Sequence, residues 1–136
     1  MSYIETLLPH RHPFLFLDEI ISANMDEIVG IKTFDDSFEA FQGHFPERRI
    51  VPGIILVETM AQCGGAGLKQ LGIVGEGVYG FATMEKVRFL SLVEFGQTVK
   101  MVVKNLRVSG RVIKQSGIAY CEDKAVAEAM WICARL

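Results

Sequence analysis

The chain has 136 residues, of which 50% are hydrophobic and 22% are charged. This composition is typical of a folded domain with one core, and it excludes a disordered chain. We therefore expect a single domain over residues 1–136. The formal net charge of −2 argues against a protein that binds nucleic acid through a basic surface.

Three cysteines, Cys63, Cys121 and Cys133, are an odd number without C-x-x-C spacing. They form a poor framework for disulfides or zinc, and reduced thiols are typical of a cytoplasmic protein. The first residues lack a basic segment followed by a long apolar run, so we expect no signal peptide. The longest apolar stretch, residues 54–71, is interrupted by Glu58 and by glycines, which argues against a membrane span.

The N-terminal third predicts a short helix and a hairpin. Residues 3–8 predict one helical turn that Pro9 stops, and residues 13–23 predict a strand. Residues 27–34 alternate in polarity and predict the hairpin partner of that strand. Residues 35–52 have no clear period and contain glycine and prolines. They predict a long loop of the kind that often carries function.

Residues 53–72 predict a helix that begins after Pro52 and ends at its last glycine. Apolar residues fall on nearly all sides of it, which predicts a helix that is buried on all sides. Gly64, Gly65 and Gly67 lower the helix propensity, but they allow a sheet or a second helix to come close.

The remaining sequence predicts four strands joined by short turns. They cover residues 78–89, 97–109, 111–122 and 125–134. Two strands, one buried helix and four antiparallel strands predict an α+β fold. We expect the hot-dog fold, an antiparallel β-sheet wrapped around one long central α-helix. Apolar surface left exposed by this arrangement would favour dimerisation.

Glu58 stands in the predicted helix among Leu56, Val57 and Met60. Burying an unpaired carboxylate is costly, so we expect Glu58 to be neutral, paired or directed into a cavity. Gln62 follows one turn later on the same face and can donate a hydrogen bond to it. A purely structural Glu–Gln pair, or a glutamate that reaches water at the helix edge, explains the spacing equally well.

His44 lies in the predicted loop, next to Phe45 and between Gly43 and Pro46. Burial there would lower the pKa of His44 and keep the imidazole neutral, as a general base requires. Burial would raise the pKa of Glu58, as a general acid requires. Two groups whose pKa values are shifted in opposite directions can act together as a general base and a general acid. A packed or surface loop histidine is the alternative.

Gly53 and Ile54 follow Pro52 at the start of the predicted helix. Free backbone N–H groups there can stabilise the negative charge that develops on a thioester carbonyl oxygen. An ordinary helix start explains the same sequence.

His10 and His12 form an H-x-H pair that could hold a metal on a strand, but no third ligand is apparent. We therefore interpret the pair as structural. Four basic side chains are candidate contacts for an acidic carrier protein, although solvated charges are the ordinary explanation. They are Arg48, Arg49, Lys86 and Arg88.

The motifs become recognisable when they are taken together. Three segments carry the resemblance: LPHRHPFLFLD at 8–18, GHFPERRIVPGI at 43–54 and ILVETMAQ at 55–62. With KVRF at 86–89 and AEAMWICAR at 127–135, they resemble the (3R)-hydroxyacyl-[acyl-carrier-protein] dehydratases of the FabZ type. The resemblance covers nearly the whole chain. Its central block is highly specific, because the loop, the helix start and the acid recur in one order and spacing.

The resemblance implies a hot-dog homodimer, often arranged as a trimer of dimers, with the acyl chain in a tunnel at the dimer interface. It implies that His44 and Glu58 are the catalytic residues and come from opposite subunits. The helix-start amide maps to Gly53 or Ile54, and the glutamine that orients the acid maps to Gln62. Phe45, beside the histidine, is a further candidate contact with the substrate. No metal or organic cofactor is implied.

The implied reaction is the dehydration of a (3R)-3-hydroxyacyl-[acyl-carrier-protein] to the trans-2-enoyl product. The chain departs from the family pattern at His12, at Arg49 and over residues 90–97. These departures leave the catalytic pair intact, but they bear on chain length and carrier docking. Fatty-acid biosynthesis and a related acyl or polyketide pathway both stay open.

Three other functions stay open as well. An isomerising dehydratase usually carries aspartate at the position of Glu58. A hot-dog acyl thioesterase would share the fold, although the loop around His44 argues against it. A non-catalytic acyl-binding protein is the third.

Overall fold

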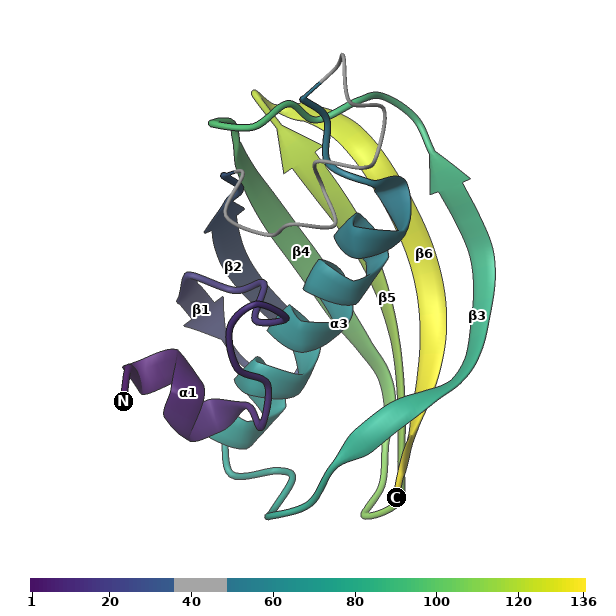
Figure 1. The fold of residues 1–136 in the computed structure, drawn as a ribbon. Helices are drawn as coiled ribbons and strands as arrows, with labels where there is room; N and C mark the ends of the chain where they lie inside the picture. Colours follow the sequence, from purple (N-terminus) through teal and green to yellow (C-terminus); the bar gives the residue numbers. More distant parts are fainter. Residues whose placement is uncertain (36–48) are drawn as a thin grey trace.

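The computed structural model describes residues 1–35 and 49–136. Within them, an antiparallel six-stranded sheet curves around one long helix (Figure 1). This is the predicted hot-dog arrangement. The elements are α1 (Tyr3–Leu7), β1 (Glu19–Ala23), β2 (Glu27–Thr33), α3 (Gly53–Gln70), β3 (Tyr79–Phe89), β4 (Thr98–Val108), β5 (Val112–Cys121) and β6 (Lys124–Arg135). The strand order across the sheet is β1-β2-β4-β5-β6-β3.

The strand predicted over residues 13–23 is wrong in its first half, because β1 begins only at Glu19. The backbone of the preceding segment bonds instead to a side chain of α3. The Phe14 carbonyl accepts a hydrogen bond from Gln62, and the Phe16 N–H donates one to the same side chain. Phe16 and Leu17 are nevertheless buried in the core. The apolar run therefore reflects burial without a strand.

The core lies between α3 and the concave face of the sheet. Along β5, buried residues alternate with partly exposed ones, as expected of a strand with one face on the core. The indole of Trp131 on β6 lies over Gly117 on β5, where a Cβ atom would come within 2.7 Å of the ring. A glycine at that position therefore leaves room for the indole.

The covered face of α3, which carries Gly64 and Gly67, packs closely against the sheet. A Cβ atom on Gly64 would lie 2.3 Å from Oε1 of Gln115, and one on Gly67 would lie 2.4 Å from Cγ2 of Ile28. Both distances are far below ordinary contact. The close approach predicted from the glycines is thus confirmed at these two positions. Gly65 differs, because its nearest neighbour would be Leu8 at 3.9 Å.

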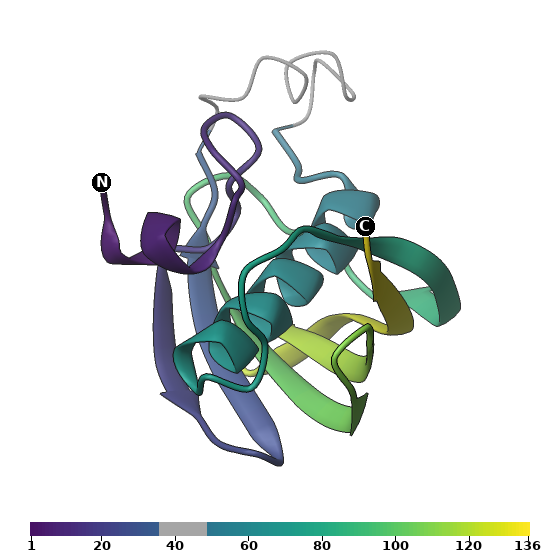
Figure 2. The ribbon, with the colours of Figure 1, turned by 90° about the horizontal axis from the view of Figure 1, so that it is seen from below.

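The prediction that α3 is buried on all sides is wrong. One side, the open face, carries Ile54, Glu58, Ala61, Gly65 and Lys69, all of them exposed or partly exposed. The sheet curves around the opposite side, while α1 lies beside the C-terminal half of α3 (Figure 2). No helix in the described ranges is long and apolar enough to cross a membrane.

Strand β3 lies at an edge of the sheet, and among the described strands it pairs only with β6. Large apolar side chains on β3 and just after it are exposed to solvent. They are Phe81, Met84, Phe89, Leu90 and Leu92. We call these five residues the β3 patch.

Candidate active site

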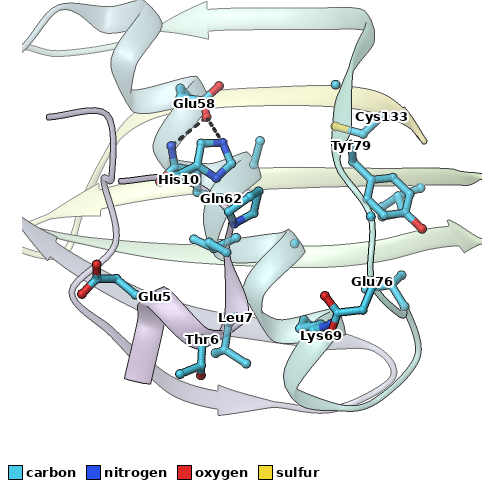
Figure 3. Close-up of a pocket in the computed structure, with 18 of the residues that line it drawn as sticks. Glu5, Thr6, Leu7, His10, Glu58, Gln62, Lys69, Glu76, Tyr79 and Cys133 are labelled. Atoms are coloured by element: carbon cyan, nitrogen blue, oxygen red, sulfur yellow. Dashed lines mark hydrogen bonds and ion pairs between the residues drawn. The ribbon is translucent and has the colours of Figure 1, made fainter. Parts of the chain in front are cut away.

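A cavity of about 530 Å³ opens beside the open face of α3. Its walls come from the N-terminal segment, from α3 and from the chain that enters β3 (Figure 3). Glu58, Gln62 and His10 all line it. Of the residues predicted from the sequence, the structure thus brings the helix acid and its glutamine into one cavity.

Glu58 is placed in this cavity by its position on the open face of α3. Its side chain is 19% exposed, and burial raises the pKa of the carboxyl because the charged form loses hydration. Nε2 of Gln62 donates a hydrogen bond of 2.8 Å to Oε2 of Glu58, and this contact partly opposes the rise in pKa. The result is a carboxyl group suited to hold a proton and to give it up.

Gln62 is buried, and both the oxygen and the nitrogen of its side-chain amide form hydrogen bonds. Its Oε1 accepts from the Phe16 N–H at 2.8 Å. Its Nε2 donates to the Phe14 carbonyl at 3.1 Å and to Glu58. Both hydrogens of the amide nitrogen therefore have partners, and the amide plane is held from two sides. The predicted Gln62–Glu58 hydrogen bond is confirmed, and the same residue also attaches the N-terminal segment to α3.

His10 is the site residue that the sequence analysis missed. Its Nε2 lies 3.7 Å from Oε2 of Glu58, and the two side chains lie next to each other in the lining of the cavity (Figure 3). Burial and, secondarily, the positive charge of Arg11 lower the pKa of His10, so the neutral ring is favoured. His12, by contrast, is exposed and does not line the cavity.

No local sequence pattern indicated that His10 would lie beside Glu58. The H-x-H spacing suggested a strand on which both rings face one side, but the segment is a turn. In this turn the Arg11 guanidinium donates to the carbonyls of Leu8 and His10 at 2.8 and 2.7 Å. The described residues contain no cluster of three metal-ligating side chains that would include the pair.

The helix start carries Gly53 and Ile54, which were predicted to bind substrate. Gly53 packs against the ring of Phe89, where a Cβ atom would come within 2.7 Å. Ile54 is 53% exposed. Neither lines the cavity beside Glu58. Pro52 precedes the helix and offers no side-chain acceptor for the first N–H groups. The role of these amides stays a prediction.

His44 and Phe45 lie outside the described residues. Their predicted roles as base and substrate contact therefore stay predictions.

Cys133 on β6 also lines the cavity. Burial, with a smaller contribution from the Glu58 charge, raises the pKa of its thiol to about 11. Burial raises the pKa of Cys63 to about 12. Because the thiolate is the nucleophilic form, neither cysteine is activated for attack on a thioester at neutral pH. Proton transfer through Glu58 is the chemistry that the described part of the cavity supports.

Residues 8–130 match the family model of the FabA-like domain. The protein "3-hydroxyacyl-[acyl-carrier-protein] dehydratase FabZ" of Syntrophobacter fumaroxidans is 40% identical over 124 residues, which cover 90% of this chain and 84% of that protein. The protein of the same name from Thermotoga maritima is 38% identical over 129 residues, which cover 95% and 92%.

Solved structures share the fold. The dehydratase heterocomplex ApeI:P from Xenorhabdus doucetiae has a TM-score of 0.84 at 15% identity, covering 100% of this chain and 92% of that one. A hypothetical thioesterase with coenzyme A from Streptococcus pneumoniae has a TM-score of 0.65 at 10% identity, covering 87% and 84%. At such identities the likeness concerns the fold alone, and a fold hosts several activities. The family match and the two sequence relatives show more: the chain belongs to the FabA-like family and, within it, to the FabZ type.

Proposed function

We propose that this chain dehydrates (3R)-3-hydroxyacyl-[acyl-carrier-protein] to trans-2-enoyl-[acyl-carrier-protein], in fatty-acid biosynthesis or a related acyl or polyketide pathway. The observation that carries the proposal is Glu58, a half-buried carboxyl of raised pKa held by Gln62 in a cavity. In a chain of the FabZ type, a carboxyl group of raised pKa that lines a cavity supports the role of general acid for Glu58. The relatives named above carry the corresponding activity in their names.

The proposed chemistry is an elimination of water. His44 removes the proton from the carbon next to the thioester carbonyl, and a helix-start N–H of Gly53 or Ile54 stabilises the negative charge on the carbonyl oxygen. The electron pair then forms the 2,3 double bond as the bond between C3 and its hydroxyl breaks. Glu58 gives its proton to the departing hydroxyl, which leaves as water. The proton on His44 returns to Glu58 or to solvent, and the enzyme is regenerated.

The homodimer belongs to the same proposal. The β3 patch exposes five large apolar side chains at a sheet edge that has no second partner among the described strands. Such an edge and such a patch favour association with another copy of the chain. A dimer built there would place one subunit's helix start, with exposed Ile54, near the second subunit. It would allow His44 and Glu58 to meet from opposite subunits, and a trimer of dimers is the proposed higher assembly.

The proposed partner is an acyl carrier protein that delivers the thioester, and the proposed location is the cytoplasm. A coenzyme A thioester carries the same reacting atoms, so it belongs in the test as a second carrier.

The test is to incubate the purified chain with 3-hydroxyacyl thioesters on both carriers and to follow the enoyl product by mass and absorbance. We expect enoyl product from the wild type and a loss of roughly 10²- to 10⁴-fold in Glu58→Gln and His44→Ala, the usual contribution of acid–base catalysis. Free carboxylic acid as product would identify a thioesterase. Absence of turnover on every chain length would leave an acyl-binding protein.

A further inference from the structure

The Glu58 carboxyl group has two oxygens with different surroundings. Oε2 accepts the hydrogen bond from Gln62 at 2.8 Å and also faces Nε2 of His10 at 3.7 Å. This second distance is longer than a hydrogen bond but too short for an intervening water. Catalytic hydrogen bonds are often long in unliganded structures and tighten when substrate binds. The two neighbours therefore converge on the same oxygen.

The tautomer of His10 follows from its other nitrogen. Nδ1 is buried and has no hydrogen-bond partner among the described residues. A hydrogen on that atom would be an orphaned buried donor, which proteins avoid more strictly than an unused acceptor. The neutral ring therefore carries its hydrogen on Nε2, where it points at Glu58.

The ring is also held in place. Arg11 donates to two carbonyls of the turn that carries His10, and its Nε lies 3.4 Å from Oε2 of Glu5 in α1. Gln62 attaches the far end of the turn to α3 through Phe14. His10 thus faces Glu58 from a braced segment rather than from a free N-terminal tail.

We propose that His10 is a positioning residue for the acid: with Gln62, its Nε2–H occupies Oε2 of Glu58, so that Oε1 is the oxygen that carries the proton and gives it to the substrate. The inference rests on the proposed function for the identity of the proton acceptor. The contact itself does not depend on that function.

The surroundings of Glu58 allow a test through its own titration. Among the described residues, the titratable groups that influence Glu58 or His10 are each other, Cys133 on β6 and Arg11. Phe is the variant of choice at His10, because it keeps the ring and the desolvation while it removes the N–H. Loss of that donor would destabilise the charged carboxylate and raise the pKa of Glu58. His10→Gln restores a donor and should bring the pKa back toward its wild-type value.

The first measurement is a carboxyl-carbon NMR titration of wild type, His10→Phe, His10→Gln and, as a matched control, His12→Phe. The Glu58 signal is assigned by its loss in Glu58→Gln. We expect an upward shift in His10→Phe alone, and a ring-nitrogen spectrum of wild type that shows hydrogen on Nε2 of His10. An unchanged Glu58 titration in His10→Phe, or hydrogen on Nδ1, would overturn the proposal. These readouts hold even if the chain has no dehydratase activity.

The second measurement is the pH profile of kcat/KM for the enoyl-forming reaction. Because the acid must be protonated, the rate falls above the pKa of Glu58. In His10→Phe we expect this alkaline limb to move to higher pH and the plateau to fall about 10-fold, a part of the usual acid–base contribution. A merely structural role would lower the plateau and leave the limb in place. A wild type without turnover would reject the proposed function, while the NMR result would still decide the role of His10.

Discussion

The two faces of helix α3 differ in their residues and in their surroundings. On the covered face, Gly64 and Gly67 leave less space than a methyl group needs. On the open face, Glu58 and Gly65 border a cavity of about 530 Å³. The covered face therefore restricts residues by size, and the open face restricts them by polar chemistry.

Gln62 lies between these two regimes. It is buried like a core residue, yet all its bonds serve the open side: two to the N-terminal segment and one to Glu58. The covered face of α3 thus packs closely against the sheet. On the open face, the side-chain amide of Gln62 holds both Glu58 and the N-terminal segment in place. Three predictions would test how separate these two sides are.

The largest effect on stability is expected from Gly67→Val on the covered face. The added side chain would overlap Ile28, and overpacking of this kind costs about 3 kcal/mol of the free energy of unfolding. Gly65→Ala is the matched control, on the open face two helical turns after Glu58. It adds a methyl group in ordinary contact with Leu8 and should leave stability unchanged or slightly higher, because alanine favours helix. Chemical denaturation measures the free energy of unfolding of both variants. An equal loss of stability in the two would contradict the proposed difference between the faces.

A smaller loss is expected from Gln62→Met, which keeps the volume and removes the amide. The Phe16 N–H and the Phe14 carbonyl would lose their hydrogen bonds to Gln62, at a cost of about 2 kcal/mol. Activity should fall more than in a purely destabilised variant, because the same change frees the Glu58 carboxyl. Denaturation and kcat/KM measured below the melting range separate the two effects. Full activity in a destabilised Gln62→Met protein would show that the amide does not position the acid.

The smallest effect is the pH dependence of stability through Glu58. Burial raises the pKa of the folded-state carboxyl, so between the unfolded and folded pKa values the folded chain binds more protons than the unfolded one. Stability contributed by this group is therefore complete below the unfolded pKa of about 4.5 and falls as pH rises through the folded value. Glu58→Gln should remove this fall and gain on wild type toward neutral pH while it loses activity. Denaturation curves at several pH values measure the difference, and parallel curves would argue against a raised pKa.

Much of the fold was predictable because it follows from local patterns. The helix from Gly53, the four C-terminal strands and the hairpin turns arise from periodicity and from turn residues near in sequence. The prediction of a strand from residue 13 was wrong over residues 13–18. There the backbone forms hydrogen bonds to the side chain of Gln62. Gln62 lies 46 residues from Phe16, and no local pattern reports that bond.

The candidate site divides in the same way. Glu58 and Gln62 are one turn apart on a helix, so the sequence alone determined that they share a face and can bond. Their place beside a cavity, and the arrival of His10 at the same carboxyl oxygen, depend on how the N-terminal turn packs against the open face of α3. Local spacing determines contacts within one element, since its geometry is regular. Contacts between elements depend on packing of the whole chain, and only the tertiary structure decided them.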